Sequence, residues 1–325
     1  MNDGFDYRET IGPAAAGRDV ATYLSDRYRH TTESAWRERI EAGEVVIDGR
    51  VADPRQVLRA GQSLVWRRPP WDEPEVPLAF AILYRDDDLL AVAKPRGLPS
   101  VPNGGFLQHT LLHCVRRLYP EATPMHRLGR GTSGLVLFAR TAAARRALAA
   151  AWREGRVEKD YRALVCGVPR EPTFTIDARI GLVPHPRLGM VHAVCVDGRE
   201  ASTTVRGVVP RAVIARGTTA RGTTARDTTA RDMMGPDMAT QGHGQAIADV
   251  RIATGRPHQI RIHMAAAGHP LVGDPVYAKG GGLVAEPGLP GDPGYRLHAY
   301  RLAFDHPTTG RRIEIECAPP PDLRS

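Results

Sequence analysis

The part of the chain after residue 78 contains many short apolar segments with few helices between them. The strand candidates are residues 88–94, 135–139, 161–166, 190–196, 203–209 and 247–252, and the helix candidates are residues 107–119 and 142–153. Parallel neighbours need a long crossover, usually a helix, whereas antiparallel neighbours can follow one another directly. We therefore predict an α+β fold built on a mixed, largely antiparallel sheet.

The beginning of the chain has a different pattern, which predicts a small α/β unit. The expected elements are helices at 17–30 and 32–41, two strands within 44–53 and a third strand at 60–66. Thr31 or Thr32 is suited to cap the second helix, and Asp48-Gly49 is typical of a tight hairpin turn.

A proline-rich segment separates this unit from the rest. Residues 68–77 contain four prolines, which favour an extended and semi-rigid spacer. A length of 325 residues also fits about two domains. We predict a first domain at 1–67, a linker at 68–77 and a second domain at 78–325.

The composition limits the compartment and the partners. No stretch of 20 apolar residues could span a membrane, and the four cysteines fit neither a metal clip nor a dense disulfide framework. The N-terminal segment MNDGFDYRET lacks the apolar region of a secretory signal, so we expect the cytoplasm. A net charge of +8 favours a polyanionic partner.

Half of this net charge comes from one repetitive segment. Arginine recurs every five residues from Arg206 to Arg231, and residues 206–232 carry a net charge of +4. Five is neither a helical nor a strand period, so we expect a low-complexity insert at about 210–240. The segment is either an arm that binds phosphates or a tolerated expansion in a surface loop, and we favour the loop.

The first domain resembles the S4 RNA-binding module, chiefly through IEAGEVVIDGR at residues 40–50 and the closing Ala60-Gly61. The resemblance implies a basic face that binds structured RNA. We assign phosphate contact to Arg37, Arg39 and Arg50. Residues 11–70 hold ten basic and eight acidic side chains, so a solvated surface of mixed charge is the alternative.

The second domain resembles the RNA pseudouridine synthases of the RluA-like branch. The segments that carry the resemblance are HRLGRGTSGL at 126–135, EKDYRALVCG at 158–167, TGRPHQIRIH at 254–263, GHPLVGDPVY at 268–277, KPRGL at 94–98, and LHA at 297–299 with FDHP at 304–307. The resemblance implies that a uridine in ribosomal or transfer RNA is detached from its ribose, turned and rejoined through carbon. It implies no cofactor and no metal.

The resemblance also implies roles for particular residues. Arg127 would help to fill the stack that the flipped base leaves, and Tyr161 would lie against the extruded uracil. Arg261 corresponds to the cation that pairs with the catalytic carboxylate. We also assign RNA contact to the residues Arg130, Arg256 and His258.

The chain departs from the family at the residue that matters most. Gly129 stands where the family has its essential aspartate, and a glycine can neither attack a substrate nor take a proton. If Arg261 is buried, it needs another partner. The candidates are Glu158, Asp160 and Asp274. Asp160 should face away from Tyr161, because neighbouring side chains on a strand point to opposite faces. For Asp274, we expect a backbone-capping role. None is a convincing replacement, and we hypothesise that another acid or an RNA phosphate complements Arg261.

Two apparent motifs are set aside. Residues 129–134 form GxGxxG, but an apolar strand does not precede them and a helix does not follow, so we expect no nucleotide cofactor. His258, His263 and His269 lack the spacing of a zinc site, and local hydrogen bonds are preferred for them.

The leading hypothesis is therefore an RNA pseudouridine synthase. The rival is a catalytically inactive RNA-binding protein or assembly factor on the same fold, which Gly129 favours. A third hypothesis is an interaction protein that uses the arginine repeat.

Overall fold

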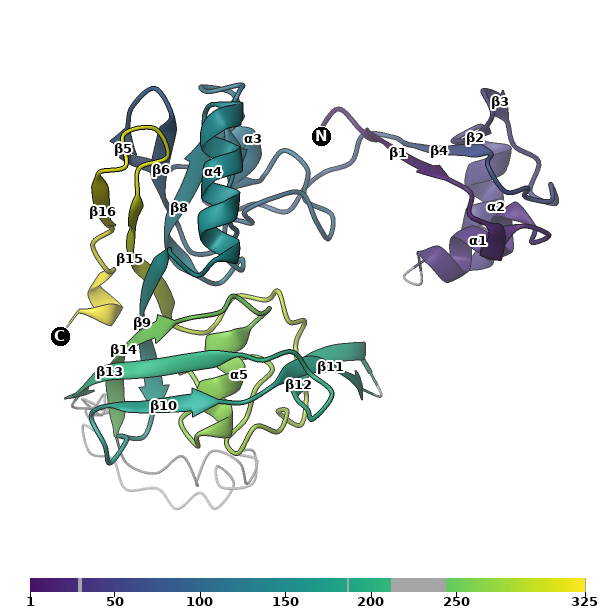
Figure 1. Ribbon diagram of the computed structural model, residues 1–325. Helices are drawn as coiled ribbons and strands as arrows, with labels where there is room; N and C mark the ends of the chain where they lie inside the picture. Colours follow the sequence, from purple (N-terminus) through teal and green to yellow (C-terminus); the bar gives the residue numbers. More distant parts are fainter. Residues whose placement is uncertain (29–30, 186, 212–243, 325) are drawn as a thin grey trace, which may run out of the picture. The chain divides into compact units, whose positions relative to one another are not determined.

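The computed structural model describes residues 1–28, 31–185, 187–211 and 244–324, and the chain forms two compact units, Met1–Pro74 and Glu75–Ser325 (Figure 1). The boundary falls within the predicted linker. Arg206 and Arg211 are described, while the rest of the arginine repeat lies outside the described residues.

The first unit contains a four-stranded sheet in the order β1-β4-β2-β3 and two helices. Its elements are β1 (Phe5–Thr10), the 3-10 helix Pro13–Ala15, α1 (Val20–Arg27), α2 (Glu33–Glu41), β2 (Val45–Ile47), β3 (Arg50–Val51) and β4 (Ser63–Arg68). Thr32 caps α2 by accepting the backbone N–H of Ala35, as predicted. Asp48 and Gly49 form the hairpin turn with φ of 49° and 84°.

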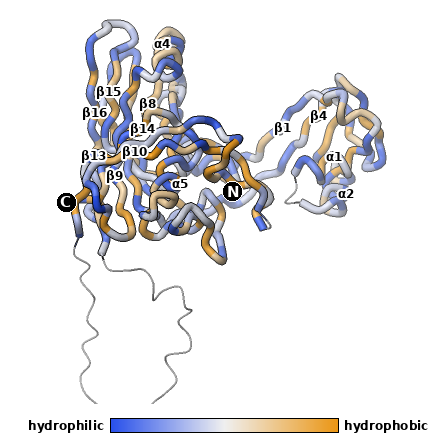
Figure 2. The backbone as a smooth tube through the Cα atoms, turned by 60° about the horizontal axis from the view of Figure 1, so that its bottom comes forward, coloured by the Kyte–Doolittle hydropathy of each residue, from blue (hydrophilic) through white to orange (hydrophobic). Residues whose placement is uncertain are grey.

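Aromatic rings fill the core of the first unit. Trp36 from α2 and Trp66 from β4 meet edge to face with centroids 4.7 Å apart, and Tyr7 from β1 stacks on Trp66 at 5.0 Å. Hydrophobic and hydrophilic stretches are interspersed along α1 and α2 in Figure 2, as expected for helices with one buried face.

The second unit is built on a ten-stranded sheet with the main order β10-β13-β14-β9-β15-β8-β6-β5. Its strands are β5 (Ala81–Arg85), β6 (Leu89–Lys94), β7 (Thr123–Pro124), β8 (Ser133–Ala139), β9 (Glu158–Cys166), β10 (Phe174–Asp177), β13 (Ser202–Arg211), β14 (Gln245–Ile252), β15 (Leu297–Asp305) and β16 (Arg312–Glu316). Among the described strands, only β15 and β8 pair in parallel. The prediction of a mixed, largely antiparallel sheet is therefore confirmed.

A hairpin and three α-helices complete the second unit. They are β11 (Ile180–His185), β12 (Gly189–Val194), α3 (Leu111–Arg116), α4 (Ala142–Arg153) and α5 (Gln259–Ala266). Helix α4 lies along β8, and α5 lies beside β13 in Figure 1. Helix α3 begins later than predicted because Thr110 caps it, accepting the N–H of His113, and it ends earlier, at Arg116. Within the described residues, no helix is long and apolar enough to cross a membrane.

Candidate active site

The turn of residues 129–132 leads directly into the buried strand β8, and the N–H of Thr132 donates to the carbonyl of Gly129. Gly134 then has a φ of +114°, and a Cβ at this position would overlap the backbone of Ala299 on β15. Only glycine allows the two strands to approach so closely. The turn is therefore held in a fixed place at the start of a central strand.

Arg261 lies on α5 and is 2% exposed. Its Nε and Nη2 donate to the two carboxylate oxygens of Asp274 at 2.7 and 2.8 Å, and its Nη1 donates to the carbonyl of Pro290 at 2.8 Å. The rings of Tyr277 and Tyr295 flank the guanidinium, with centroids 5.0 and 4.1 Å from Cζ. Burial alone would lower the pKa of Arg261, but hydrogen bonds to Asp274 and its charge outweigh burial and raise the pKa.

Asp274 has two functions in the structure. Its Oδ1 also accepts the backbone N–H groups of Val276 and Tyr277 at 2.9 and 3.0 Å. The predicted backbone-capping role is therefore correct, but the expectation that Asp274 is no convincing partner for Arg261 was wrong. A carboxylate has about four acceptor sites, so one side chain can cap a turn and pair with a guanidinium.

The other two candidate acids belong to a separate charged network. Asp160 accepts from Arg251 at 2.6 Å and from Arg301 at 2.8 Å, and Glu158 pairs with the same two arginines. Tyr161, the next residue on β9, packs instead in the apolar core. Asp160 therefore faces away from Tyr161, as the alternation of strand side chains predicts.

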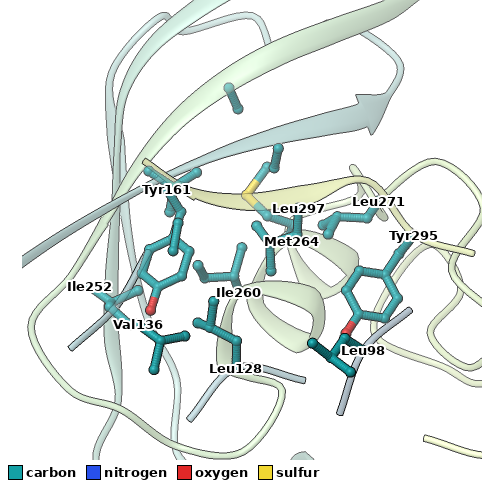
Figure 3. Close-up of a cluster of buried hydrophobic side chains, with 14 of the residues drawn as sticks. Leu98, Leu128, Val136, Tyr161, Ile252, Ile260, Met264, Leu271, Tyr295 and Leu297 are labelled. Carbon is teal, nitrogen blue, oxygen red and sulfur yellow. The ribbon is translucent and has the colours of Figure 1, made fainter. Parts of the chain in front are cut away.

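Tyr161 is 9% exposed and lies on β9 between β14 and β15. Burial raises the pKa of its phenol to about 12. Figure 3 shows Tyr161 and Tyr295 on opposite sides of one apolar cluster, with Leu128 and Ile260 between them in this view. The cluster thus connects the Tyr161 ring with Leu128, the residue before Gly129, and with Tyr295, whose ring lies against Arg261.

The first half of the 126–135 segment is more accessible than the second, which is buried. Arg127 and Gly129 are exposed. Arg130 pairs with Asp292 at 2.9 Å and lies over the ring of Phe106. The segment thus presents two arginines on either side of the glycine.

The residues at the start of α5 are tied to neighbouring loops. Arg256 donates through Nε to the carbonyl of Glu200 at 3.0 Å. His258 has a φ of 55°, and its Nδ1 lies 2.9 Å from the hydroxyl of Tyr277. Burial lowers the pKa of His258 to about 4, so the ring is neutral at physiological pH.

The other two histidines of the discounted zinc motif also make local hydrogen bonds. The ring nitrogens of His263 lie 2.9 Å from the Thr203 hydroxyl and 3.0 Å from the Ala178 carbonyl. Nδ1 of His269 lies 3.1 Å from the Cys166 carbonyl. Among the described residues, no group of histidine, cysteine and acidic side chains is arranged to hold a metal.

The three arginines assigned in the first unit have different surroundings. Arg37 pairs with Glu33 at 2.6 Å, one turn earlier on α2. Arg39 lies over the rings of Trp36 and Trp66 at 5.0 and 5.3 Å. Arg50 is exposed on the hairpin. Their assignment to phosphate contact stays a prediction, with Arg50 the most accessible of the three.

Sequence reasoning missed Tyr295, which contacts Arg261 and lies beneath the 129–132 turn. Tyr295 stands only two residues before the LHA motif, but it lies 166 positions after Gly129. The two glycines of the turn, Gly129 and Gly131, are the feature of the sequence that fits a bulky side chain against this segment.

Comparisons with known proteins agree with this architecture. The sequence pattern of the family described as RNA pseudouridylate synthase matches residues 88–266. A protein of Synechocystis sp. named as an uncharacterized RNA pseudouridine synthase is 39% identical over 93% of this chain and 94% of its own length. Ribosomal large subunit pseudouridine synthase D of Xanthomonas campestris is 32% identical over 98% of this chain and 90% of its own length.

The solved structure of human RNA pseudouridylate synthase domain containing 1 shares the fold, with a TM-score of 0.55 and 24% identity over 78% of this chain and 89% of that one. The names of the relatives support the enzyme and not the inactive alternative. The chain belongs to the RNA pseudouridylate synthase family, whose members isomerise uridine to pseudouridine in RNA.

Proposed function

We propose that this chain isomerises a uridine of ribosomal RNA without using a side chain at residue 129. The reaction breaks the bond between C1′ and N1, forms a bond between C1′ and C5, and exchanges the proton on C5 for one on N1. It is redox neutral and needs no co-reactant. The ribosomal target is supported by the relative named for the large ribosomal subunit; the cytoplasmic location stays a prediction.

The observation that carries this proposal is the buried pair of Arg261 and Asp274, whose side chains are each 2% exposed. A buried ion pair seldom stabilises a fold more than apolar side chains of similar volume. The side chain of Tyr295 contacts both Arg261 and the position of Gly129. The location of the ion pair so close to Gly129 therefore favours a functional role over a purely structural one. The pair supplies a fixed guanidinium beside the turn even though residue 129 has no carboxylate.

The cost of extruding a base must be offset by contacts to it. Unstacking costs a few kcal/mol, and stacking of the base on the Tyr161 ring would return about 1 to 3 kcal/mol. The Tyr161 ring is 9% exposed and belongs to an apolar cluster that includes Leu128, so the uracil must displace part of this cluster. The exposed Arg127 would fill the vacated stack.

We assign further RNA contacts to residues that are at least partly exposed. Arg130 lies on the same segment as Gly129, while Arg256 and His258 lie at the start of α5. The first unit would add affinity through Arg50, in keeping with its S4-like pattern. The contacts of the arginines would be electrostatic and therefore sensitive to salt, whereas the neutral His258 would not add to this salt dependence.

The test is to incubate the purified protein with transcribed ribosomal and transfer RNA and to map pseudouridine chemically. We expect product in ribosomal RNA, and we expect Tyr161→Leu to abolish it while RNA binding persists. Tyr300→Phe, a change on the neighbouring strand β15, serves as the control with unchanged activity. RNA binding without product in any RNA would refute the proposal and support the non-catalytic rival.

A further inference from the structure

Gly129 and Gly131 both lie against the side chain of Tyr295. A Cβ on Gly129 would stand 2.7 Å from the Tyr295 hydroxyl, and a Cβ on Gly131 would stand 2.8 and 2.9 Å from ring atoms Cε1 and Cζ. Neither glycine has a positive φ, so the backbone itself would accept an alanine. A larger side chain at either position would therefore overlap Tyr295, and the Tyr295 side chain packs against both glycines.

Tyr295 also joins the two halves of the site. Its hydroxyl lies 3.1 Å from Oγ1 of Thr132, and its ring lies over the Arg261 guanidinium at 4.1 Å. The side chain is 2% exposed, whereas Gly129 above it is exposed. The phenol thus lies directly under the point where the surface lacks a side chain.

We propose that Tyr295 takes the place of the missing side chain at residue 129 and acts as a positioning residue. Its ring holds the plane of the Arg261 guanidinium, and its hydroxyl holds the 129–132 turn. The inference about packing stands alone, while the inference about turnover rests on the proposed function.

The packing is tested by thermal unfolding of Gly129→Ala and Gly131→Ala, each with and without Tyr295→Phe. Overpacking should lower Tm by about 5 °C for either alanine in the wild-type background. Among the described residues other than its chain neighbours, the Tyr295 hydroxyl is the one atom closer than 3.6 Å to the new Cβ at 129, and Tyr295→Phe removes it, so this change should relieve Gly129→Ala.

Gly131→Ala is the matched control, because its clash is with ring carbons that phenylalanine retains and with Cα of Pro293 at 3.1 Å. We expect the same loss of Tm for Gly131→Ala with Tyr295 or Phe at 295. An equal loss for Gly129→Ala in both backgrounds, or no loss at all, would overturn the proposed replacement.

Turnover is tested with the Tyr295→Phe variant and ribosomal RNA. Loss of a positioning hydroxyl should lower kcat on the order of 100-fold, while KM changes less than about twofold because Tyr295 is 2% exposed and offers almost no surface to an RNA. Tyr84→Phe removes another hydrogen-bonded phenol, bound to Asp86 at 2.6 Å, and serves as the control with normal kcat.

The outcomes separate the two proposals. A kcat of Tyr295→Phe within twofold of wild type would overturn the positioning role while leaving the proposed function intact. A wild-type protein that forms no pseudouridine would overturn the proposed function and the role in turnover, and the paired Tm values would still decide whether Tyr295 fills the place of residue 129.

Discussion

Asp274→Asn is the substitution that most directly tests the buried pair. The carboxylate accepts four hydrogen bonds, two from Arg261 and two from the backbone of residues 276 and 277. Asparagine keeps Oδ1 and its backbone acceptor role but places an NH2 group opposite Nε of Arg261. Both the charge and one acceptor are lost at a site that water does not reach.

Removing one partner of a buried pair costs about 3 to 5 kcal/mol because the remaining charge is left uncompensated. We expect the free energy of unfolding of the second unit to fall by this amount in urea denaturation, at an unchanged m value. Glu200→Gln breaks an exposed ion pair, in which the side chain of Arg179 is 53% exposed and that of Glu200 is 83% exposed. This change should lower the free energy of unfolding by less than about 0.5 kcal/mol. Equal losses for the two variants would refute the reasoning.

Three further predictions follow from single contacts. Burial lowers the pKa of His126 to about 4, and its Nε2 accepts the N–H of Leu137. Between pH 6.5 and 4, this histidine therefore binds more protons in the unfolded chain than in the folded chain. The free energy of unfolding should fall as the pH drops from 6.5 to 4. His126→Gln should flatten this slope by as much as about 1.4 kcal/mol per pH unit in pH-dependent unfolding. Arg50→Ala should lower by about 0.9 the steepness with which the logarithm of the RNA-binding constant falls against the logarithm of the salt concentration. Arg37→Ala should change this slope by less in the same titration, because Arg37 already pairs with Glu33. Gly129→Asp alone should reduce Tm and bring no gain of pseudouridine, because the new side chain meets the Tyr295 hydroxyl.

Local sequence signals were sufficient for most elements. The predicted helix at 142–153 coincides with α4, because Thr141 caps it by accepting the N–H of Ala144 and its apolar positions recur at helical spacing. The apolar run before Pro95 predicted β6 to within one residue. The strands and α-helices that were not predicted are β1, β5, β7, β10, β11, β15, β16 and α5. Strand β1, for example, was missed because its sequence FDYRET is polar and it joins the sheet through backbone pairing with β4.

The site was predictable only in part. Tyr161, Arg261 and Gly129 could be selected as candidates because each stands in a contiguous motif, and their roles stay predictions. The pairing of Arg261 with Asp274 was underestimated because a Gly-Asp-Pro turn already explains its aspartate through backbone caps. Tyr295 could not be paired with Gly129 from sequence, since contact between residues so far apart depends on the order of strands in the sheet.

That strand order has a consequence for synthesis on the ribosome. Strand β15, made from residues 297–305, lies between β9 and β8 in the middle of the sheet. Until this stretch leaves the exit tunnel, the strands on its two sides have no shared neighbour, and their inner edges offer unpaired backbone groups to other chains. The nascent second unit therefore cannot close its sheet before residues 297–305 have been translated, and a chain truncated before residue 297 would leave two separate, aggregation-prone half-sheets.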